Sequence, residues 1–487
     1  MSSTLLTLPS YVAGLPPTET LKLQKLVEVF NRHQSGNAIK HKYYEGNITI
    51  NDVNLGIAVP NNMKHIGVGC AWGQKTVDVL AARSMFDGFV DQSGSDATEM
   101  DEIVKRNNLI TEYNKATRAE LEYGCVFATL SQFVDGVPKI RFHSPRSAAA
   151  LWSGEKGRID CGLAIIDTKK DETDDTWQPS ILNLYTDDST WVITRGSWSW
   201  QSRVVPHRFG QPLMVPLTWN ATSQKPFGRS RLKMPIRELI NGYVRTIINA
   251  TIGLEFATSP QKYLLGITDE QYDAMIDNKF KQYVGSIMLA TPNPETGQNP
   301  QFGQLAQGNI APHVEMLRIL ATQFSAATGL TVTDTGVVND ANPTSSDAIM
   351  AQSQTLIAMA EQLNQENGDA LSTIARMTLA MQQNISPDQL SEDMQGIMAH
   401  FKNPSMPSVS VTADAAIKIA SARPNFSQTD TFLEMVGFSQ ADIRRIRAQE
   451  SRARGLAVLE GLTAGGSLNT EEIGAQTEQP QEEEVKQ

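Results

Sequence analysis

The chain has 487 residues, of which 40% are hydrophobic and 20% are charged, a composition typical of a globular protein with several domains. Its 42 Lys and Arg residues and 53 Asp and Glu residues give a formal net charge of −11. This balance excludes a protein whose whole surface is basic enough to bind nucleic acid, so any contact with DNA must be local.

The cysteines and the apolar segments indicate the cellular compartment. Cys70, Cys125 and Cys161 are widely spaced and form no CxxC pair, which favours a reducing environment. No stretch approaches the roughly 20 apolar residues that a membrane span needs, and the N-terminus lacks the basic segment of a signal peptide. We therefore expect a cytoplasmic protein that does not enter a membrane.

Three helices are predicted within the first 125 residues. Apolar residues recur at helical spacing between Leu21 and Phe30, and a break follows at Gly46. Two further helices are expected within residues 75–125, on either side of a polar loop at 91–98.

Residues 124–220 are predicted to be mostly strand, because β-branched and aromatic residues alternate with polar residues there. Asp135-Gly136 provides the turn of one hairpin, since this pair readily adopts positive φ, and Asp187-Asp188 provides the turn of another. We expect one twisted antiparallel sheet.

The helical period returns after residue 231. A long helix is expected from 236 to 258, with Pro235 near its start, and another from 311 to 328, ended by Gly329. The mixed segment between them, residues 261–309, is interpreted as a small inserted module.

The longest predicted helix covers residues 344–384. It begins after Pro343 at a Thr-x-x-Asp capping pattern, contains no proline, and would extend about 60 Å at 1.5 Å per residue. Apolar residues recur every seven positions, interrupted by Ser353 and Asn367, and few charges flank them. This pattern favours packing within a larger assembly over an isolated coiled coil. Short, proline-broken segments at 386–425 and an amphipathic helix at 439–462 are expected to follow.

Two short motifs resemble enzyme sites. Gly69 to Thr76 contains glycines, Lys75 and Thr76 but lacks the spacing of a phosphate-binding loop. Asp334-Thr335-Gly336 matches the catalytic triplet of aspartic proteases, but a second copy is missing, so a protease would have to be a dimer. The seven histidines have no metal-ligand spacing, and we expect no metal, no cofactor and no catalytic residue.

The distribution of basic residues is uneven. None of the 57 residues between Arg318 and Arg376 is Lys or Arg, although the chain average of 42 in 487 predicts about five. Two explanations of this run stand side by side. In one, the helices of this stretch are simply buried, since buried helices carry few charges; in the other, the stretch forms a surface that must not bind a polyanion. Five arginines lie within residues 444–454, where they form either a solvated helix face or a face directed at phosphates.

Several segments, taken in order, resemble the portal (head-to-tail connector) proteins of tailed double-stranded DNA bacteriophages. They are Tyr43-Tyr44-Glu45-Gly46, residues 210–217, Phe227-Gly228-Arg229-Ser230-Arg231-Leu232, residues 260–266, residues 324–330 and residues 342–349. Together they extend across residues 40–385, whereas both termini match less clearly.

The resemblance implies a mixed α+β, helix-rich chain with wing, stem, clip and crown regions in a ring oligomer, typically of twelve subunits. The implied regions are a wing at 1–235, stem helices at 236–258 and 311–329, a clip at 259–310, a tunnel loop at 330–343, the long helix and wing return at 344–425, crown helices at 426–465 and a disordered acidic tail at 466–487.

The resemblance also implies sites and partners. Expected tunnel-lining residues are Thr333, Asp334, Thr335, Val338, Asn339 and Asp340; expected partner-binding clip residues are Asp269, Lys279, Lys281 and Glu295; expected DNA-facing crown residues are Arg444, Arg445 and Arg447. The implied partners are other copies of the chain, the major capsid protein, the terminase large subunit, the head-to-tail adaptor, a scaffold protein and DNA that passes without sequence specificity. Such a protein is assembled in the host cytoplasm and resides in the virion.

Two alternatives remain at this point. One is the homodimeric aspartic protease that would use Asp334, and the other is a helical scaffold protein, built on the 344–384 helix, that forms no ring. The native mass separates the three hypotheses, because only the portal hypothesis predicts a large annular particle without turnover.

Overall fold

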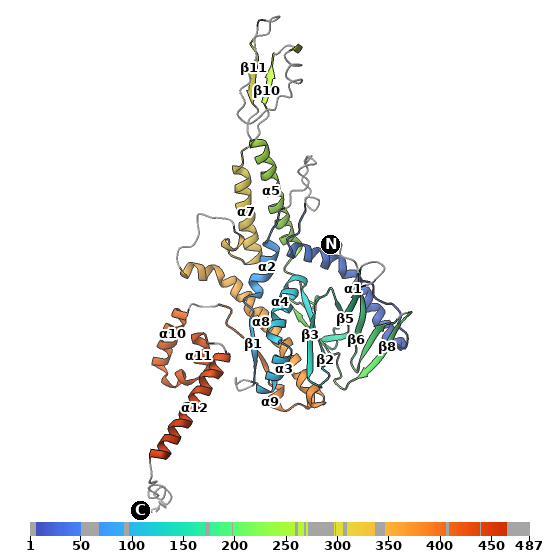
Figure 1. Ribbon diagram of the computed structural model, residues 1–487, viewed down its shortest axis with the longest axis vertical. Coiled ribbons are helices and arrows are strands. Elements are labelled where there is room, and N and C mark those ends of the chain that lie inside the picture. Colours follow the sequence, from blue (N-terminus) through green and yellow to red (C-terminus); the bar gives the residue numbers. More distant parts are fainter. Residues whose placement is uncertain are drawn as a thin grey trace, which may run out of the picture. The chain divides into compact units, whose positions relative to one another are not determined.

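The computed structural model describes residues 6–49, 68–91, 97–170, 176–196, 198–258, 262–266, 269–270, 297, 299–304, 309–336, 346–405, 409–438 and 440–464. The chain divides into two compact units, Met1–Ser405 and Met406–Gln487, and each is described by itself. The first unit contains all the strands of the described ranges (Figure 1).

The described residues between 6 and 123 form four α-helices and one strand, where only three helices were expected. They are α1 Pro17–Tyr44, α2 Trp72–Ala81, β1 Phe86–Val90, the short 3-10 helix Thr98–Met100, α3 Asp101–Arg106 and α4 Leu109–Tyr123. Strand β1 pairs antiparallel with β12 (Met398–Phe401), which lies far along the sequence. The prediction missed β1 because its partner is remote and its five residues are too few to show a period.

The β-rich region forms two antiparallel sheets, so the expectation of one sheet was wrong. Three strands in the order β3-β2-β9 form the smaller sheet: β2 Cys125–Gln132, β3 Pro138–His143 and β9 Met214–Thr218. Five strands in chain order form the larger sheet: β4 Ala148–Ser153, β5 Arg158–Lys170, β6 Trp177–Tyr185, β7 Ser189–Arg195 and β8 Trp200–Pro206. Both hairpin predictions are confirmed, since β2 pairs with β3 and β6 pairs with β7.

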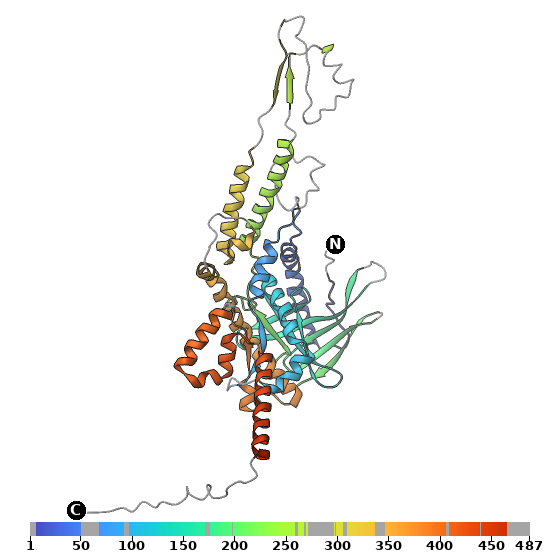
Figure 2. The same cartoon turned by 60° about the vertical axis from the view of Figure 1, so that its left-hand side comes forward.

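Helices α5 (Met234–Thr258) and α7 (Ala311–Thr328) lie side by side (Figures 1 and 2). Gly242 of α5 permits this approach, because a Cβ at this position would lie 3.2 Å from Leu320 Cδ2 of α7. Both helices were predicted to within about two residues. Strands β10 (Lys262–Leu265) and β11 (Gln301–Gln304) pair with each other, and most of the insert between them lies outside the described residues.

Helix α8 (Ser346–Gln383) confirms the longest predicted helix. Its apolar positions, including Leu356, Leu363 and Met377, are buried against β9, β12 and α2 of the same chain. The apolar repeat therefore stabilises the fold of one chain and needs no second helix of a coiled coil. A 3-10 turn (Pro387–Gln389) and the short α9 (Glu392–Gln395) follow.

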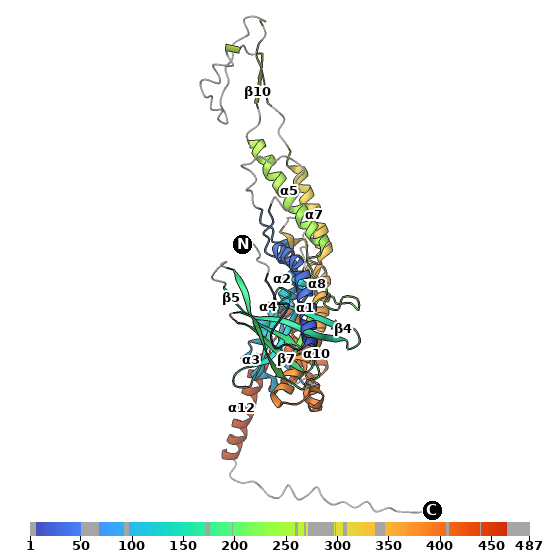
Figure 3. The ribbon, with the colours of Figure 1, turned by 90° about the vertical axis from the view of Figure 1, so that its right-hand side faces the viewer.

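Three apolar clusters hold the first unit together. One lies between the smaller sheet, α4 and the C-terminal half of α8; the second joins α2, α5, α7 and the N-terminal half of α8; the third packs α1 on the larger sheet (Figure 3). Cys70, Cys125 and Cys161 are free and buried in these clusters. Within the described ranges, no helix combines the length and apolarity needed to cross a bilayer.

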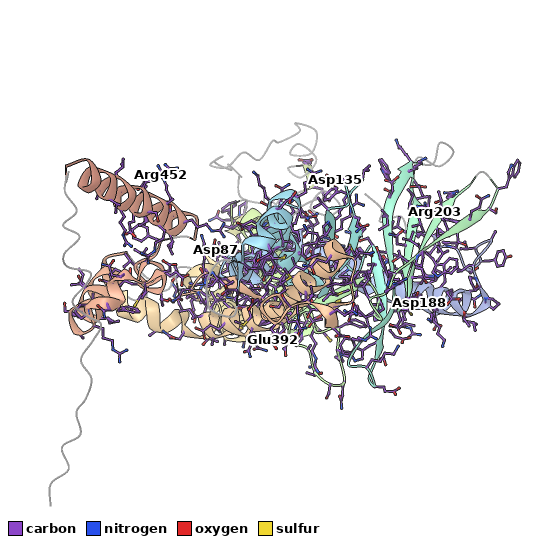
Figure 4. The ribbon with its side chains drawn as sticks, turned by 90° about the horizontal axis from the view of Figure 1, so that it is seen from below. Asp87, Asp135, Asp188, Arg203, Glu392 and Arg452 are labelled. Atoms are coloured by element: carbon purple, nitrogen blue, oxygen red, sulfur yellow. The ribbon has the colours of Figure 1, made fainter. Side chains whose placement is uncertain are left out.

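The second unit is helical. It consists of α10 (Val409–Ala422), a 3-10 helix (Pro424–Gln428), α11 (Asp430–Val436) and α12 (Gln440–Ala464). The prediction of short broken segments up to residue 425 was wrong at α10, a 14-residue helix. The final helix was predicted correctly, and Arg452 projects from it (Figure 4).

Candidate functional site: the junction below helices α5 and α7

The segment Phe227–Leu232 passes between several backbone strands where the helix pair begins. Gly228 has a φ of 66°, and a Cβ at this position would lie 2.4 Å from the carbonyl oxygen of Trp219 and 2.5 Å from that of Gly124. No other residue fits there without backbone movement. Ser230 is buried and its hydroxyl donates to the carbonyl oxygen of Glu122. The glycine and serine therefore fix the path of the chain into α5.

Arg231 joins three helices at this junction. Its Nε donates to the carbonyl oxygen of Thr76 in α2 at 2.7 Å, and its Nη2 donates to that of Thr328, the last residue of α7, also at 2.7 Å. Nη1 lies 3.4 Å from the sulfur of Met359 in α8. Burial lowers the pKa of Arg231 to about 10, so the guanidinium stays charged at neutral pH. Its positive charge complements the negative end of the α7 dipole.

Trp72 and Lys75, at the start of α2, hold the turn that follows α7. The indole Nε1 of Trp72 donates to the carbonyl oxygen of Thr335 at 3.0 Å, and Nζ of Lys75 donates to that of Asp334. The Trp72 ring stacks on Phe324 of α7, with ring centroids 4.5 Å apart. The segment Gly69–Thr76, which resembles a phosphate-binding loop, thus holds the segment Asp334-Thr335-Gly336, which resembles a protease triplet.

Gly73, within the segment Gly69–Thr76, allows α1 and α2 to pack closely. A Cβ at Gly73 would lie 2.0 Å from the carbonyl oxygen of Tyr43, at the end of α1. The side chain of Tyr43 continues to α5, where its hydroxyl donates to Asn241 Oδ1 at 2.7 Å. Tyr44 donates to Asp78 Oδ1 of α2 at 3.0 Å. Gly73 and the two tyrosines therefore bring α1, α2 and α5 together, which accounts for these residues without a phosphate ligand.

The carboxylate of Asp334 stabilises the turn in which Asp334 lies. Oδ2 accepts hydrogen bonds from the backbone N of Thr331 at 3.0 Å and from the Thr331 hydroxyl at 2.8 Å. The turn itself is a 3-10 helix, Thr333–Thr335, which ends at Gly336 with a φ of 75°. A protease dyad requires two carboxylates that share a proton. Among the residues that the structure describes, no carboxylate forms a hydrogen bond with Asp334, so this geometry gives the protease alternative no support.

Three of the six expected tunnel residues belong to the described part of the chain. Thr333 is exposed and Asp334 is half-buried. Thr335 is buried, and its hydroxyl donates to the carbonyl oxygen of Val332 at 2.6 Å. Its side chain thus stabilises the turn. The other three residues, Val338, Asn339 and Asp340, lie outside the described residues.

The expected clip and crown residues are only partly described. Asp269 is exposed, whereas Lys279, Lys281 and Glu295 lie outside the described residues. Arg444 and Arg445 are exposed on α12. Arg447 instead pairs with Asp430 at 2.7 Å and with Glu450 at 3.0 Å. Its charge is therefore already balanced within the second unit.

A buried polar network beside α8 explains why Asn367 interrupts the apolar repeat. Its Nδ2 donates to Glu120 Oε2 at 2.8 Å and to the Tyr113 hydroxyl at 3.0 Å, and this hydroxyl lies 2.8 Å from the Ser84 hydroxyl. Burial raises the pKa of Glu120 to about 8, so this carboxyl is largely protonated at neutral pH. Nothing in the sequence indicated that Asn367 would contact Glu120. For the junction described above, the only indication in the sequence was its glycine residues.

Comparison with known proteins identifies the family. The sequence model of the family described as phage portal protein, SPP1 Gp6-like, matches residues 37–455, which is 419 of the 487 residues. No curated protein sequence matches the chain.

Solved structures similar to the chain come from gene transfer agent (GTA) particles. A chain of the virion of the native particle is 11% identical with a TM-score of 0.43, over 72% of this chain and 84% of that chain. A chain of the neck of the native particle computed with C12 symmetry is 12% identical with a TM-score of 0.42, over 76% and 90%. A chain of the neck of the empty particle computed with C6 symmetry is 12% identical with a TM-score of 0.43, over 73% and 86%. Because the family match extends over most of its length, the chain belongs to the phage portal proteins and has a portal function at the capsid vertex.

Proposed function

We propose that this portal protein forms a ring, typically of twelve subunits, whose axial passage carries double-stranded DNA during packaging and ejection. The observation that carries the proposal is the run without Lys or Arg between Arg318 and Arg376. It includes the turn at Asp334 and most of α8. The proposal agrees with the family, because phage portal proteins have a structural role in the virion and no enzymatic activity.

The physical reason is that a ring multiplies each residue by the number of subunits. One lysine at the passage would become a belt of positive charges, and each phosphate that it neutralised would add salt-dependent affinity for DNA. A passage that bound DNA tightly would slow or stop the movement of the DNA. Lys75 donates to the carbonyl oxygen of Asp334, and this contact helps to fix the turn.

We further propose the contacts of the other regions. The insert at 259–310 receives the terminase large subunit during packaging and the head-to-tail adaptor afterwards, with Asp269, Lys279, Lys281 and Glu295 as contact residues. Arg444 and Arg445 of α12 face packaged DNA, because both are exposed on a helix with an excess of basic residues. The wing contacts the major capsid protein, and a scaffold protein assists ring assembly in the host cytoplasm before the portal enters the virion.

The native mass of the purified protein, together with negative-stain images, tests the ring. We expect uniform annular particles whose mass is an integral multiple of 53.5 kDa. A monomer at every concentration would contradict the proposal. Dimers or filaments would instead favour a scaffold without a ring.

A further inference from the structure

A cavity of about 660 Å³ lies between α1, strand β4 and the N-terminus of α5, and the junction segment Phe227–Leu232 forms part of its wall. Its apolar wall includes Phe30, Phe127, Phe227 and the alanines of β4. Its lining contains five basic side chains, Lys40, Lys225, Arg229, Lys233 and Arg237. The other polar lining groups are neutral and include Asn37, Tyr123, Ser230 and His33, whose pKa is lowered by burial. No Asp or Glu belongs to the lining. We call this site the basic cavity.

Four cations of the basic cavity have no carboxylate partner among the described residues. Within the described ranges, Lys225, Arg229, Lys233 and Arg237 form no ion pair with a carboxylate. Nε of Arg237 is buried and has no acceptor among the described residues. A buried N–H group without an acceptor destabilises the fold, so an anion inside the cavity would stabilise it.

Lys40 and the α5 terminus strengthen the positive potential. Nζ of Lys40 donates to the carbonyl oxygen of Tyr123 at 2.9 Å and to Asn37 Oδ1 at 3.3 Å, and both of these acceptors are neutral. Glu122 acts on Lys40 electrostatically, but its carboxylate is paired with His41 at 3.0 Å. Lys233 and Met234 place the positive end of the α5 dipole at the rim of the cavity.

The complementary charge lies on α8. Glu361 and Asp369 are exposed on this helix, and eight residues, about 12 Å, separate them along one face. No Lys or Arg lies between Arg318 and Arg376, so nothing on this stretch of α8 balances them. No residue of α8 belongs to the lining of the basic cavity, so the acidic face of α8 and the basic cavity are formed by different parts of the first unit.

A ring of identical subunits closes only through two different, mutually complementary surfaces. We propose that the acidic face of α8, with Glu361 and Asp369, docks into the basic cavity of the neighbouring copy, where Lys233 and Arg237 at the cavity rim pair with the two carboxylates. This inference rests on the proposed ring, and it adds the surface and the charges through which one copy selects the next.

A charge swap tests the inference. The variant Lys233→Glu/Arg237→Glu and the variant Glu361→Lys/Asp369→Lys are each expected to need at least about tenfold more protein for half-maximal ring assembly, measured by native mass, because each places like charges against one another. The chain that carries all four substitutions is expected to assemble like the wild type, since the pairs are re-formed with opposite sign. Circular dichroism and thermal unfolding of each variant confirm that it folds.

The matched control is Lys25→Glu/Arg203→Glu, which reverses two exposed cations outside the basic cavity and should leave assembly unchanged. Normal assembly of either cavity or α8 variant would overturn the inference while the ring itself stands. A folded four-substitution chain that fails to assemble would overturn it as well. Inorganic phosphate that binds the wild type but not Lys233→Glu/Arg237→Glu, with assembly unaffected, would assign the cavity to a free anion and also overturn it. A wild-type protein that forms no ring would instead contradict the proposed function.

Discussion

The indole of Trp72 donates a 3.0 Å hydrogen bond to the carbonyl oxygen of Thr335, a residue 263 positions further along the chain. The same ring stacks on Phe324 of α7, so one side chain fixes both the end of that helix and the turn after it. We propose that the Thr333–Thr335 turn borders the DNA passage. Its position is then set by the first residues of α2 and by the C-terminal residues of α7.

Trp72→Phe is expected to loosen this turn. Phenylalanine retains most of the ring contacts but has no N–H, so the carbonyl of Thr335 loses its donor at a cost of about 1 to 2 kcal/mol. Amide hydrogen exchange at Asp334 and Gly336, whose N–H groups donate within the turn, should become faster. Trp177→Phe, at a half-exposed tryptophan on β6, is the control. Unchanged exchange at both amides would show that Trp72 does not hold the turn.

Arg231→Met is expected to lower the free energy of unfolding by about 3 kcal/mol or more, because two buried helix carbonyls lose their donors. The control is Arg203→Met on β8, where the side chain is exposed (Figure 4) and the change should stay within about 0.5 kcal/mol. Thermal and denaturant-induced unfolding measure both. Equal effects of the two substitutions would refute the role of Arg231 at the junction.

The buried carboxyl of Glu120 makes stability depend on pH. Burial raises its pKa to about 8 in the folded chain from an ordinary value of 4.5. Between these values the folded chain binds a proton that the unfolded chain has lost, so its contribution to stability falls as pH rises from about 4.5 to about 8. The total loss is a few kcal/mol, at about 1.4 kcal/mol per pKa unit.

Glu120→Gln removes this titration. The difference in melting temperature between the variant and the wild type should therefore become more favourable to the variant as pH rises through that window. Glu155→Gln, at an exposed turn position, should show no such trend. A difference that stays constant between pH 5 and pH 8 would show that Glu120 is ionised in the folded chain.

Introduction of a cation at the turn tests the passage of DNA. Under the proposed function, Asp334→Lys or Asn339→Lys places a ring of ammonium groups at the passage, and packaging and ejection should slow or stall, more strongly at low salt. Asp334→Asn keeps an acceptor for Thr331 without adding positive charge, and it should retain near-normal passage. Packaged DNA per particle and ejection kinetics are the measurements. Normal passage in both lysine variants would contradict the assignment of residues 330–343 to the tunnel.

The elements that were predicted correctly are local ones. The hairpin turn at Asp135-Gly136, the end of α7 at Gly329 and the length of α8 each depend on neighbouring residues, on turn geometry or on a helical period. The division into two sheets could not be predicted in this way, because β9 pairs with β2 across the whole five-stranded sheet that lies between them in sequence. For the same reason the pairing of β1 with β12 was missed.

The sequence by itself determined the long helices α5, α7, α8 and α12, where two hairpins turn, and that the stretch from Arg318 to Arg376 contains no basic residue. Only the tertiary structure decided that Trp72, Arg231 and Thr335 belong to one junction, and that Asn367 finds its partners in Glu120 and Tyr113. Local periods are set by a few neighbouring dihedral angles, whereas a buried donor and its acceptor can come from any two points that folding brings together.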